Sequence, residues 1–426
     1  MSLFGSLFTA VSGLSAQSYA MGAISNNIAN VNTIGYKDIS TKFSSLVTNG
    51  GANTGAYSSG GVLANTQTNV SQQGTLAQTQ NPTDLAISGN GFFVVRPQPN
   101  SGSPVYYTRS GSFTQDDNGF LRNTAGMVLY GWPLDSAGNI PAANSDLTSL
   151  QPVNVSFLGG QTKPTSTGTL SINVDSGTAT AGTFTRNMTV YDSLGAPQTL
   201  AMTFTKTSTN NAWTMSVKDG AGNNLLPVNT GHTPNDNTVD VTFNSDGTIH
   251  QVGATAGAKT LTVAGTAGTG IVWGNGSTAQ SIKLDLSAVT QYAASSNVIS
   301  ITQDGAALGL RTGVAIDSSG VVSATFSNGT QAKIYQLPIA TFSNPDGLSE
   351  VTGNAYTVTS NSGDYNLRIT GASGAGTIGS SQLEQSTVDL AAEFSNMIVT
   401  QRAYTANTKV ISTADQMLQA LTNIIQ

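Results

Sequence analysis

Apolar or aromatic residues recur with a strict period of seven near the carboxyl end of the chain, and this repeat constrains the fold more than any other feature. The stripe consists of Leu383, Leu390, Met397, Tyr404, Ile411, Leu418 and Ile425, widened by Phe394, Ala414 and Leu421. Residues 384–425 contain neither Gly nor Pro, so the pattern predicts an uninterrupted helix of roughly 60 Å. A narrow apolar seam of this kind is stable only when a partner helix covers it.

The amino-terminal segment carries a shorter version of the same repeat. Its stripe consists of Leu7, Val11, Leu14, Met21, Ile24, Ile28 and Val31. An Asn-rich stretch follows at residues 26–32, and Gly35 comes directly after it. Asn side chains compete for backbone hydrogen bonds and favour turns, so we expect this helix to end near residues 31–34. It is the first candidate partner for the carboxyl-terminal helix.

Two arrangements satisfy these stripes. The helices could pair inside one monomer, or copies of the chain could cover them together. The carboxyl-terminal stripe is the longer by about ten residues, and other faces also carry apolar residues such as Phe4, Phe8, Ile398 and Val410. A two-helix hairpin would leave much of that surface in water. We therefore expect all the stripe residues named above to take part in self-assembly.

Between residues 35 and 383 the helical period gives way to short alternating runs separated by Gly and Asn. Examples are GFFVV at 91–95, LAMTFT at 200–205 and WTMSV at 213–217. Asp-Gly and Asp-Asn-Gly turns separate such runs, a pattern typical of all-β structure. Gly and Pro cluster near 151–163, and a second break lies near 312–319. These breaks suggest that the middle segment is inserted into a β domain formed from both flanks.

The predicted fold is mixed but mainly β, with long coiled-coil terminal helices and two all-β domains, the outer one inserted in the inner one. The expected boundaries are 1–34 with 384–426 for the helical domain, 35–74 with 368–383 for connecting segments, 75–150 with 318–367 for the inner β domain, and 151–317 for the outer β domain.

Composition excludes several classes of function. Charged residues make up 9% of the chain, the net charge is −6, and there is no run of Lys or Arg, so a nucleic-acid-binding footprint is absent. The absence of Cys rules out disulfides and thiol chemistry. No side-chain charge precedes Lys37 and no apolar run reaches about 18 residues, so we expect neither a cleaved signal peptide nor membrane insertion.

The residues that could carry chemistry are few. Asp116 and Asp117 could form a catalytic pair, but adjacent side chains on such a turn usually point apart. The histidines are His232 and His250, without the spacing of a metal site. The tryptophans, Trp132, Trp213 and Trp273, could form a carbohydrate platform, although packed anchors are the favoured role. We expect no enzyme activity, no cofactor and no metal.

Long motifs then connect the chain to a known family. Residues 6–37, SLFTAVSGLSAQSYAMGAISNNIANVNTIGYK, and residues 383–426 resemble the two terminal signatures of the bacterial flagellar axial proteins. DLAISGNGFFVV at 84–95 and GSFTQDDNGFLRNTAGMVLYGW at 111–132 resemble the inner domain of rod and hook subunits. VYDSLGAPQTLAMTF at 190–204, with FNSDGTI at 243–249, is similar to the outer domain of hook subunits, which the shorter rod proteins lack.

The resemblance implies a structural subunit that self-assembles into a hollow, curved, extracellular tube. This tube would act as a flexible universal joint that passes torque from rod to filament. The implied partners are copies of the chain, a rod protein at the proximal end, a hook-associated junction protein at the distal end, the hook cap and the type III export apparatus. The alternatives are a distal rod or hook–filament junction protein, and, in another class, a secreted β-rich adhesin or carbohydrate-binding protein.

Overall fold

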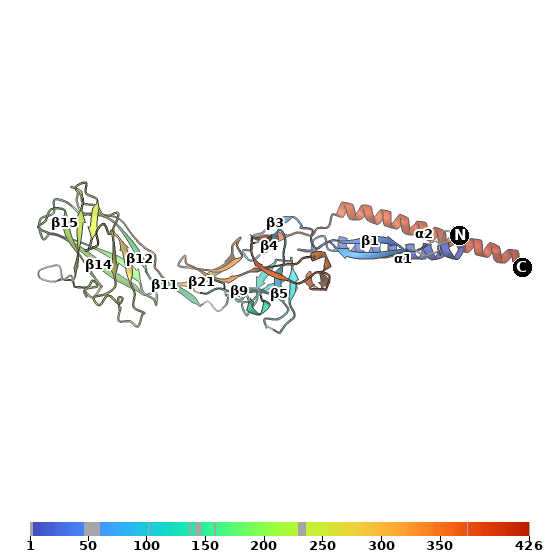
Figure 1. The fold of residues 1–426 in the computed structure, drawn as a ribbon, viewed down its shortest axis with the longest axis horizontal. Helices are drawn as coiled ribbons and strands as arrows, with labels where there is room; N and C mark the ends of the chain where they lie inside the picture. Colours follow the sequence, from blue (N-terminus) through green and yellow to red (C-terminus); the bar gives the residue numbers. More distant parts are fainter. Residues whose placement is uncertain are drawn as a thin grey trace. The chain divides into compact units, whose positions relative to one another are not determined.

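The computed structural model describes residues 3–46, 60–100, 102–135, 138–140, 146–156, 159–228, 236–372 and 374–425. The chain divides into two compact units (Figure 1). Unit 1 comprises residues 1–157, 314–324 and 333–426, and unit 2 comprises residues 158–313 and 325–332. The described part is mainly β, with one long helix near each terminus, which confirms the predicted fold class.

Unit 2 is built from two antiparallel-rich sheets. The first has the strand order β13-β14-β15-β16-β17 and the second the order β18-β19-β12-β20. The strand bounds are β11 Gly160–Lys163, β12 Thr167–Asn173, β13 Thr183–Tyr191, β14 Pro197–Lys206, β15 Ala212–Lys218, β16 Thr238–Phe243, β17 Ile249–Val252, β18 Thr260–Val263, β19 Ile282–Asp285, β20 Asn297–Gln303 and β21 Ala306–Ile316. Strand β21 runs across one boundary between the units.

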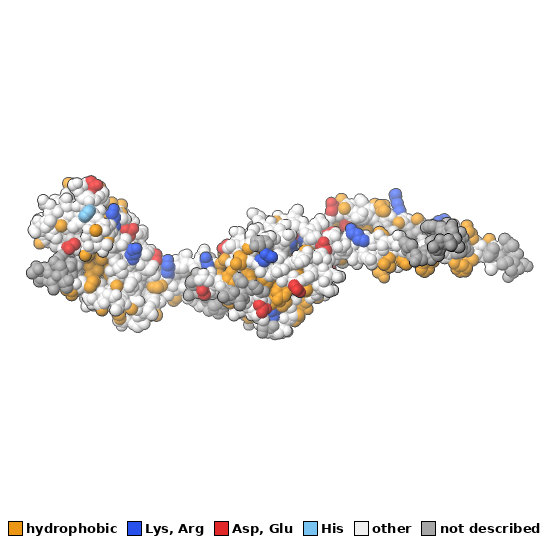
Figure 2. All heavy atoms as spheres, viewed as in Figure 1, with side chains coloured by type: hydrophobic (Ala, Val, Ile, Leu, Met, Phe, Trp, Pro, Cys, Tyr) orange, Lys and Arg blue, Asp and Glu red, His pale blue; other side chains and the backbone are white. Residues whose placement is uncertain are grey.

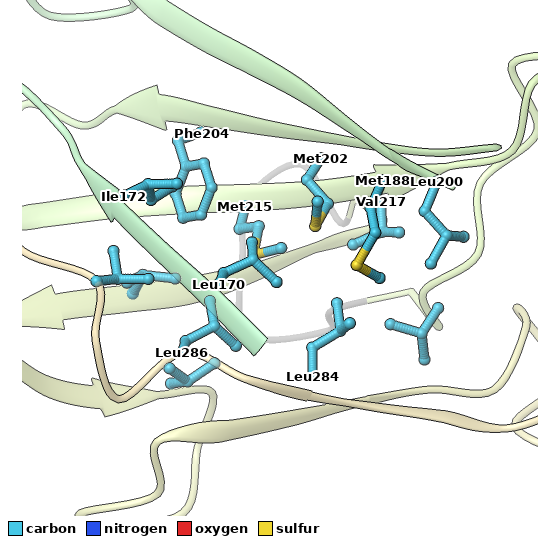
Figure 3. Packing of buried hydrophobic residues seen from close by; sticks show 14 of the residues in the cluster. Leu170, Ile172, Met188, Leu200, Met202, Phe204, Met215, Val217, Leu284 and Leu286 are labelled. Atoms are coloured by element: carbon cyan, nitrogen blue, oxygen red, sulfur yellow. The ribbon is translucent and has the colours of Figure 1, made fainter. Parts of the chain in front are cut away.

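The core of unit 2 follows from the alternation in its strands. Leu200, Met202 and Phe204 of β14 are fully buried at every second position, while the residues between them are more exposed. They join buried residues of the second sheet, such as Leu170 of β12, in one hydrophobic cluster (Figure 3). A period of two places one face of each strand in the core.

Trp213 and Trp132 serve as packed anchors, as expected. Trp213 is fully buried on β15, and its Nε1 donates to Gln291 Oε1 at 3.1 Å. Trp132 is buried in unit 1 and donates to Ser149 Oγ. Trp273 is partly buried against the core of unit 2 and donates to Gln280 Oε1. All three indoles therefore pair their polar atom while packing their rings.

Unit 1 contains the two long helices and a β region. Its elements are α1 Leu3–Ala29, β1 Ile39–Ser45, β2 Val62–Thr68, β3 Leu76–Gln78, β4 Leu85–Ser88, β5 Phe93–Arg96, β6 Tyr106–Thr108, β7 Phe113–Gln115, β8 Leu121–Asn123, β9 Val128–Pro133, β10 Gln151–Pro152, β24 Pro338–Thr341, β25 Ser349–Val351, β26 Ala355–Thr357, β27 Asn366–Ile369, β28 Thr377–Ser380, β29 Gln382–Glu384 and α2 Leu390–Ile425, with β22 Val321–Phe326 and β23 Gln331–Gln336 at the second boundary. Short 3-10 turns lie at Leu147–Ser149 and Pro345–Gly347.

The β region of unit 1 joins strands from opposite ends of the chain. Strand β3 pairs with β29, β4 with β28, and β6 with β26. The central order is β9-β5-β6-β26-β25. Its core includes Phe92, Tyr107, Tyr130, Trp132 and Tyr356. Segments far apart in sequence thus hold the two helices on one β framework.

The helix boundaries differ from the prediction. Helix α2 begins at Leu390, six residues after the expected start at Glu384. Leu383 is buried in strand β29, opposite Ala77 of β3, and is not a helical stripe position. Asp389 fixes the actual start, because its carboxylate accepts the N–H groups of Ala391 and Ala392. Helix α1 ends at Ala29, two residues before the expected range.

Candidate assembly surface of the terminal helices

Helix α1 buries small residues along one side. The sheltered positions are Ala10, Gly13, Ala16, Ala20, Ala23, Ile24 and Asn27. Helix α2 lies beside α1 (Figure 1). At Gly13 the approach is so close that a Cβ atom there would lie 2.8 Å from Asn407 Nδ2 of α2. A larger side chain at Gly13 would displace Asn407, so the small residue allows this contact between the helices.

A β-hairpin lies against another side of α1. Strands β1 and β2 pair in register from Ile39 opposite Thr68 to Ser45 opposite Val62. Thr9 Oγ1 donates to Gly60 O at 2.8 Å, and Ser12 Oγ accepts the Val62 N–H at 3.2 Å. Helix α1 is thus fixed to α2 and to the hairpin partly by polar contacts.

The predicted stripe residues divide into three groups. Leu7, Leu14, Met21, Ile28, Val31, Met397, Ile411 and Leu418 are half-buried, and Ile24 and Ala414 are buried. Val11, Leu390, Phe394 and Tyr404 are exposed. Leu421 and Ile425 lie in α2, outside the residues whose side chains the structure describes. The buried side of α1 could have been found from its small residues, which recur at spacings of three and four: Ala10, Gly13, Ala16, Ala20 and Ala23. A repeat of large apolar residues does not include them.

Much apolar surface of the helices remains exposed. Phe4, Phe8 and Tyr19 of α1 expose 75%, 65% and 64% of their surface. Ile398, Val399 and Met417 of α2 expose 52%, 66% and 61%. Figure 2 shows hydrophobic side chains along this helical part. We call these six residues the exposed helical surface, and a surface of this kind marks a protein interaction site.

A buried ionic cluster joins the two terminal segments to the β region. Glu384 of β29 is fully buried, and Lys37 Nζ lies 2.5 Å from its Oε1. The same oxygen accepts the Gly74 N–H, and Oε2 accepts from Arg109 Nη1 at 3.3 Å. Lys37 also donates to Gln72 O. Burial lowers the pKa of Lys37, although the Glu384 carboxylate acts in the opposite direction.

A hydrogen-bond network next to this cluster fixes where the helices begin and end. Asn27 Oδ1 accepts from Tyr36 Oη and from the Ile39 N–H. Asn27 Nδ2 donates to Glu393 Oε1 of α2 at 3.0 Å. Thr387 Oγ1 donates to Asp38 Oδ1 and accepts the Asp38 N–H. The end of α1 and the start of α2 are therefore held together by buried and partly buried polar groups.

Of the residues that could carry chemistry, the structure describes Asp116, Asp117 and His250. Asp116 forms an ion pair with Arg122 at 2.6 Å and accepts the N–H groups of Asn118 and Phe120. Burial would raise the pKa of Asp116, but these hydrogen bonds outweigh burial and lower it. His250 is exposed, and His232 lies outside the described residues. Within the described ranges, no group of three or more acidic or His residues could hold a metal ion.

In the part of the chain that the structure describes, neither helix is long and apolar enough to cross a membrane.

Four family models match successive parts of the chain. They are "Flagella basal body rod protein" at 7–37, "Flagellar hook protein FlgE/F/G D1 domain" at 86–182, "Flagellar basal body protein FlaE D2 domain" at 156–306 and "Flagellar basal body rod FlgEFG protein C-terminal" at 380–424. Together they cover both helices and strands from both units.

Full-length relatives agree with these matches. The chain is 35% identical over 427 residues to the flagellar hook protein FlgE of Rhizobium meliloti, and 32% identical over 590 residues to that of Caulobacter vibrioides. Each alignment covers 100% of both chains. A crystal structure of the Helicobacter pylori flagellar hook protein FlgE2 is similar with a TM-score of 0.45 and 13% identity, covering 71% of this chain and 98% of that one.

Proposed function

The chain belongs to the flagellar hook protein family and is a structural subunit of the bacterial flagellar hook, and we propose that its exposed helical surface joins copies of it into the hook tube. The observation that carries this proposal is the exposure of Phe4, Phe8, Ile398, Val399 and Met417 on helices that already pair with each other. Pairing within one chain leaves these side chains in water.

Assembly follows from the physical cost of that exposure. Burying apolar surface gains about 25 cal/mol per Å², and the large side chains of the exposed helical surface lie on both α1 and α2. Different faces on one subunit make heterologous contacts, and such contacts build an open helical polymer when the rotation does not close. A hollow tube with the helices at its inner wall is the arrangement we infer.

The β surfaces supply the flexibility that a universal joint needs. Charged residues make up 9% of the chain, so contacts between β regions of neighbouring copies would consist mostly of Ser, Thr, Asn and Gly. Such surfaces form few ion pairs that fix one geometry. We infer that neighbouring copies slide over one another as the hook bends and passes torque to the filament.

The partners and location follow from this role. We infer that the polymer contacts a rod protein at its proximal end and a hook-associated junction protein at its distal end, with the hook cap present during growth. The chain would reach this extracellular position through the type III export apparatus.

The test adds charge to the exposed helical surface. The double variant Val399→Asp, Met417→Asp should remain monomeric under conditions in which the unaltered chain forms tubes, because a charge buried in an apolar contact is strongly unfavourable. The free energy of unfolding of the monomer should change by about 0.5 kcal/mol or less, since both side chains are exposed. Sedimentation and negative-stain electron microscopy measure assembly.

The matched control is Val399→Leu, Met417→Leu, which keeps both positions apolar and should form tubes. Tubes of normal form from the double Asp variant, at the concentration that the unaltered chain requires, would contradict the proposal. An unassembled control would show that shape at these positions, not apolar burial, governs the contact.

A further inference from the structure

The buried ionic cluster contains more positive than negative charge. Lys37 and Arg109 share the single carboxylate of Glu384, and the side chains of all three are at most 2% exposed. The Arg109 guanidinium also stacks over the Phe92 ring, 5.2 Å from its centroid. Its Nε is buried and has no hydrogen-bond partner within the described residues. A buried donor without a partner calls for an explanation, such as a bound ion or water.

Arg109 also forms part of a pocket wall. The pocket has a volume of about 350 Å³ and is lined by Arg109, Arg368, Phe92, Phe342, Ser71 and Ser343, among others. Arg368 lies on β27, where it pairs with Ile339 of β24, and it is half-buried. Within the described ranges its side chain forms none of the ion pairs found. Two arginines from distant parts of the chain therefore line one pocket.

One acidic residue is close to this pocket. Asp346 accepts the Ser71 N–H at 2.8 Å and the Ser71 hydroxyl at 2.9 Å, so both of its carboxylate oxygens are already engaged. Glu384 lies behind Arg109 and is fully buried. Neither carboxylate makes an ion pair with Arg368 among the described residues, which leaves that guanidinium available to a ligand.

We propose that this pocket binds a small oxyanion, a carboxylate or a phosphate-like group, between Arg109 and Arg368. Guanidinium groups match the geometry of such anions and bind them with charge-assisted hydrogen bonds. The Ser343 hydroxyl lines the pocket and can donate, and Phe92 and Phe342 supply apolar parts of the lining. The anion would come either from solution or from an acidic side chain of a neighbouring copy.

The first experiment uses the full chain kept monomeric at low concentration. Orthophosphate or acetate is titrated against sodium chloride of equal ionic strength, and the thermal midpoint of unit 1 is followed. We expect a saturable rise for the unaltered chain. Arg368→Gln should weaken the apparent affinity about tenfold or more, which is the value of a lost charged hydrogen bond. Lys333→Gln, which removes an exposed charge elsewhere in unit 1, should leave the affinity unchanged.

The second experiment separates the two sources and rests on the proposed function. A neighbour's carboxylate in the pocket predicts that Arg368→Gln and added orthophosphate each raise the concentration needed for tube formation. An anion from solution predicts no such change. The absence of a saturable rise in the first experiment, or an equal response of Arg368→Gln and Lys333→Gln, would overturn the site whatever the result for assembly.

Discussion

Unit 2 and the terminal helices bury their apolar residues in opposite ways. In unit 2, Phe204, Trp213 and Leu284 from two facing sheets are fully buried. On the helices, Phe8 and Val399 keep 65% and 66% of their surface exposed, and the contact between α1 and α2 depends on small residues such as Gly13. Unit 2 therefore has a core of its own, while the helices leave apolar surface exposed, which we propose that neighbouring copies cover.

This difference separates stability from assembly. A substitution in the core of unit 2 should act on folding, because close-packed interiors respond to the loss of even a few atoms. A substitution on the exposed helical surface should act on association, because its side chains contribute little to the folded monomer. The buried ionic cluster belongs to neither group, since it joins the two terminal segments to the β region of unit 1.

The largest expected effect is in the core of unit 2. Trp213→Ala should lower the free energy of unfolding of unit 2 by about 3–5 kcal/mol, because it leaves a cavity and leaves Gln291 without its indole donor. Differential scanning calorimetry should show one transition moving to lower temperature. The control Val272→Ala, at a position 73% exposed, should leave the transition in place. Equal shifts for the two variants would mean that burial of Trp213 in the core does not determine the thermal stability of unit 2.

The next effect concerns the buried ionic cluster. Lys37→Met should destabilise unit 1 by about 3 kcal/mol, the lower end of the range for a broken buried pair, because Arg109 still partners Glu384. Chemical denaturation followed by circular dichroism measures the change. The exposed Lys42 supplies the control, Lys42→Met, which should behave like the unaltered chain. Matching midpoints for the two variants would disprove a stabilising role for the cluster.

The smallest effect is a difference in pH dependence. In unit 2, burial alone would raise the pKa of Asp192, but hydrogen bonds from Asn275 and Gln198 outweigh burial and hold the pKa below the ordinary value of 3.8. The stability from Asp192 is therefore present above pH 3.8 and is lost as the pH falls through the folded-state pKa.

At the start of α2 the pKa shift, and with it the change of stability with pH, has the opposite sign. Burial raises the pKa of Glu393 above its ordinary 4.5, and Asp38 and Asp389 raise it further, against the opposing hydrogen bond from Asn27. Its contribution is present below pH 4.5 and is lost as the pH rises through the folded-state pKa. Amide hydrogen exchange should be measured between about pH 3 and pH 7, a range that includes the ordinary pKa values of carboxyl groups. As the pH falls, amides of unit 2 should exchange faster, while amides at the start of α2 should be better protected. Glu393→Gln should remove only the second response.

The sequence predicted the existence of both helices and the β character of the middle from local period alone. The seven-residue repeat gave Met397, Ile411 and Leu418 as half-buried positions of α2, and alternation gave the buried face of β14. The seven-residue repeat also placed Leu383 in the helix, although this residue lies in strand β29. A spacing pattern alone does not show where the helix begins. Pairing with β3 and the Asp389 cap set the real boundary.

The contact between α1 and α2 was harder to predict. Large apolar residues dominate a hydrophobic repeat, so the repeat in α1 emphasises Leu7 and Leu14, which are half-buried. Close approach of the two helices instead favours small residues such as Gly13, where an added Cβ would meet the Asn407 side chain of α2, and Ala10 and Ala16 are likewise buried. Periodicity shows that a face is apolar, but it does not show how near the neighbouring helix lies.

The amino-acid sequence by itself determined the elements: where helical and strand periods occur, where turns interrupt them, and which ends carry unmatched apolar stripes. Only the tertiary structure decided which distant groups meet, such as Lys37 with Glu384 across 347 positions. The reason is physical. Local period depends on residues within a few positions of one another, while long-range contacts depend on the path of the whole chain and on the fit of surfaces that this path brings together.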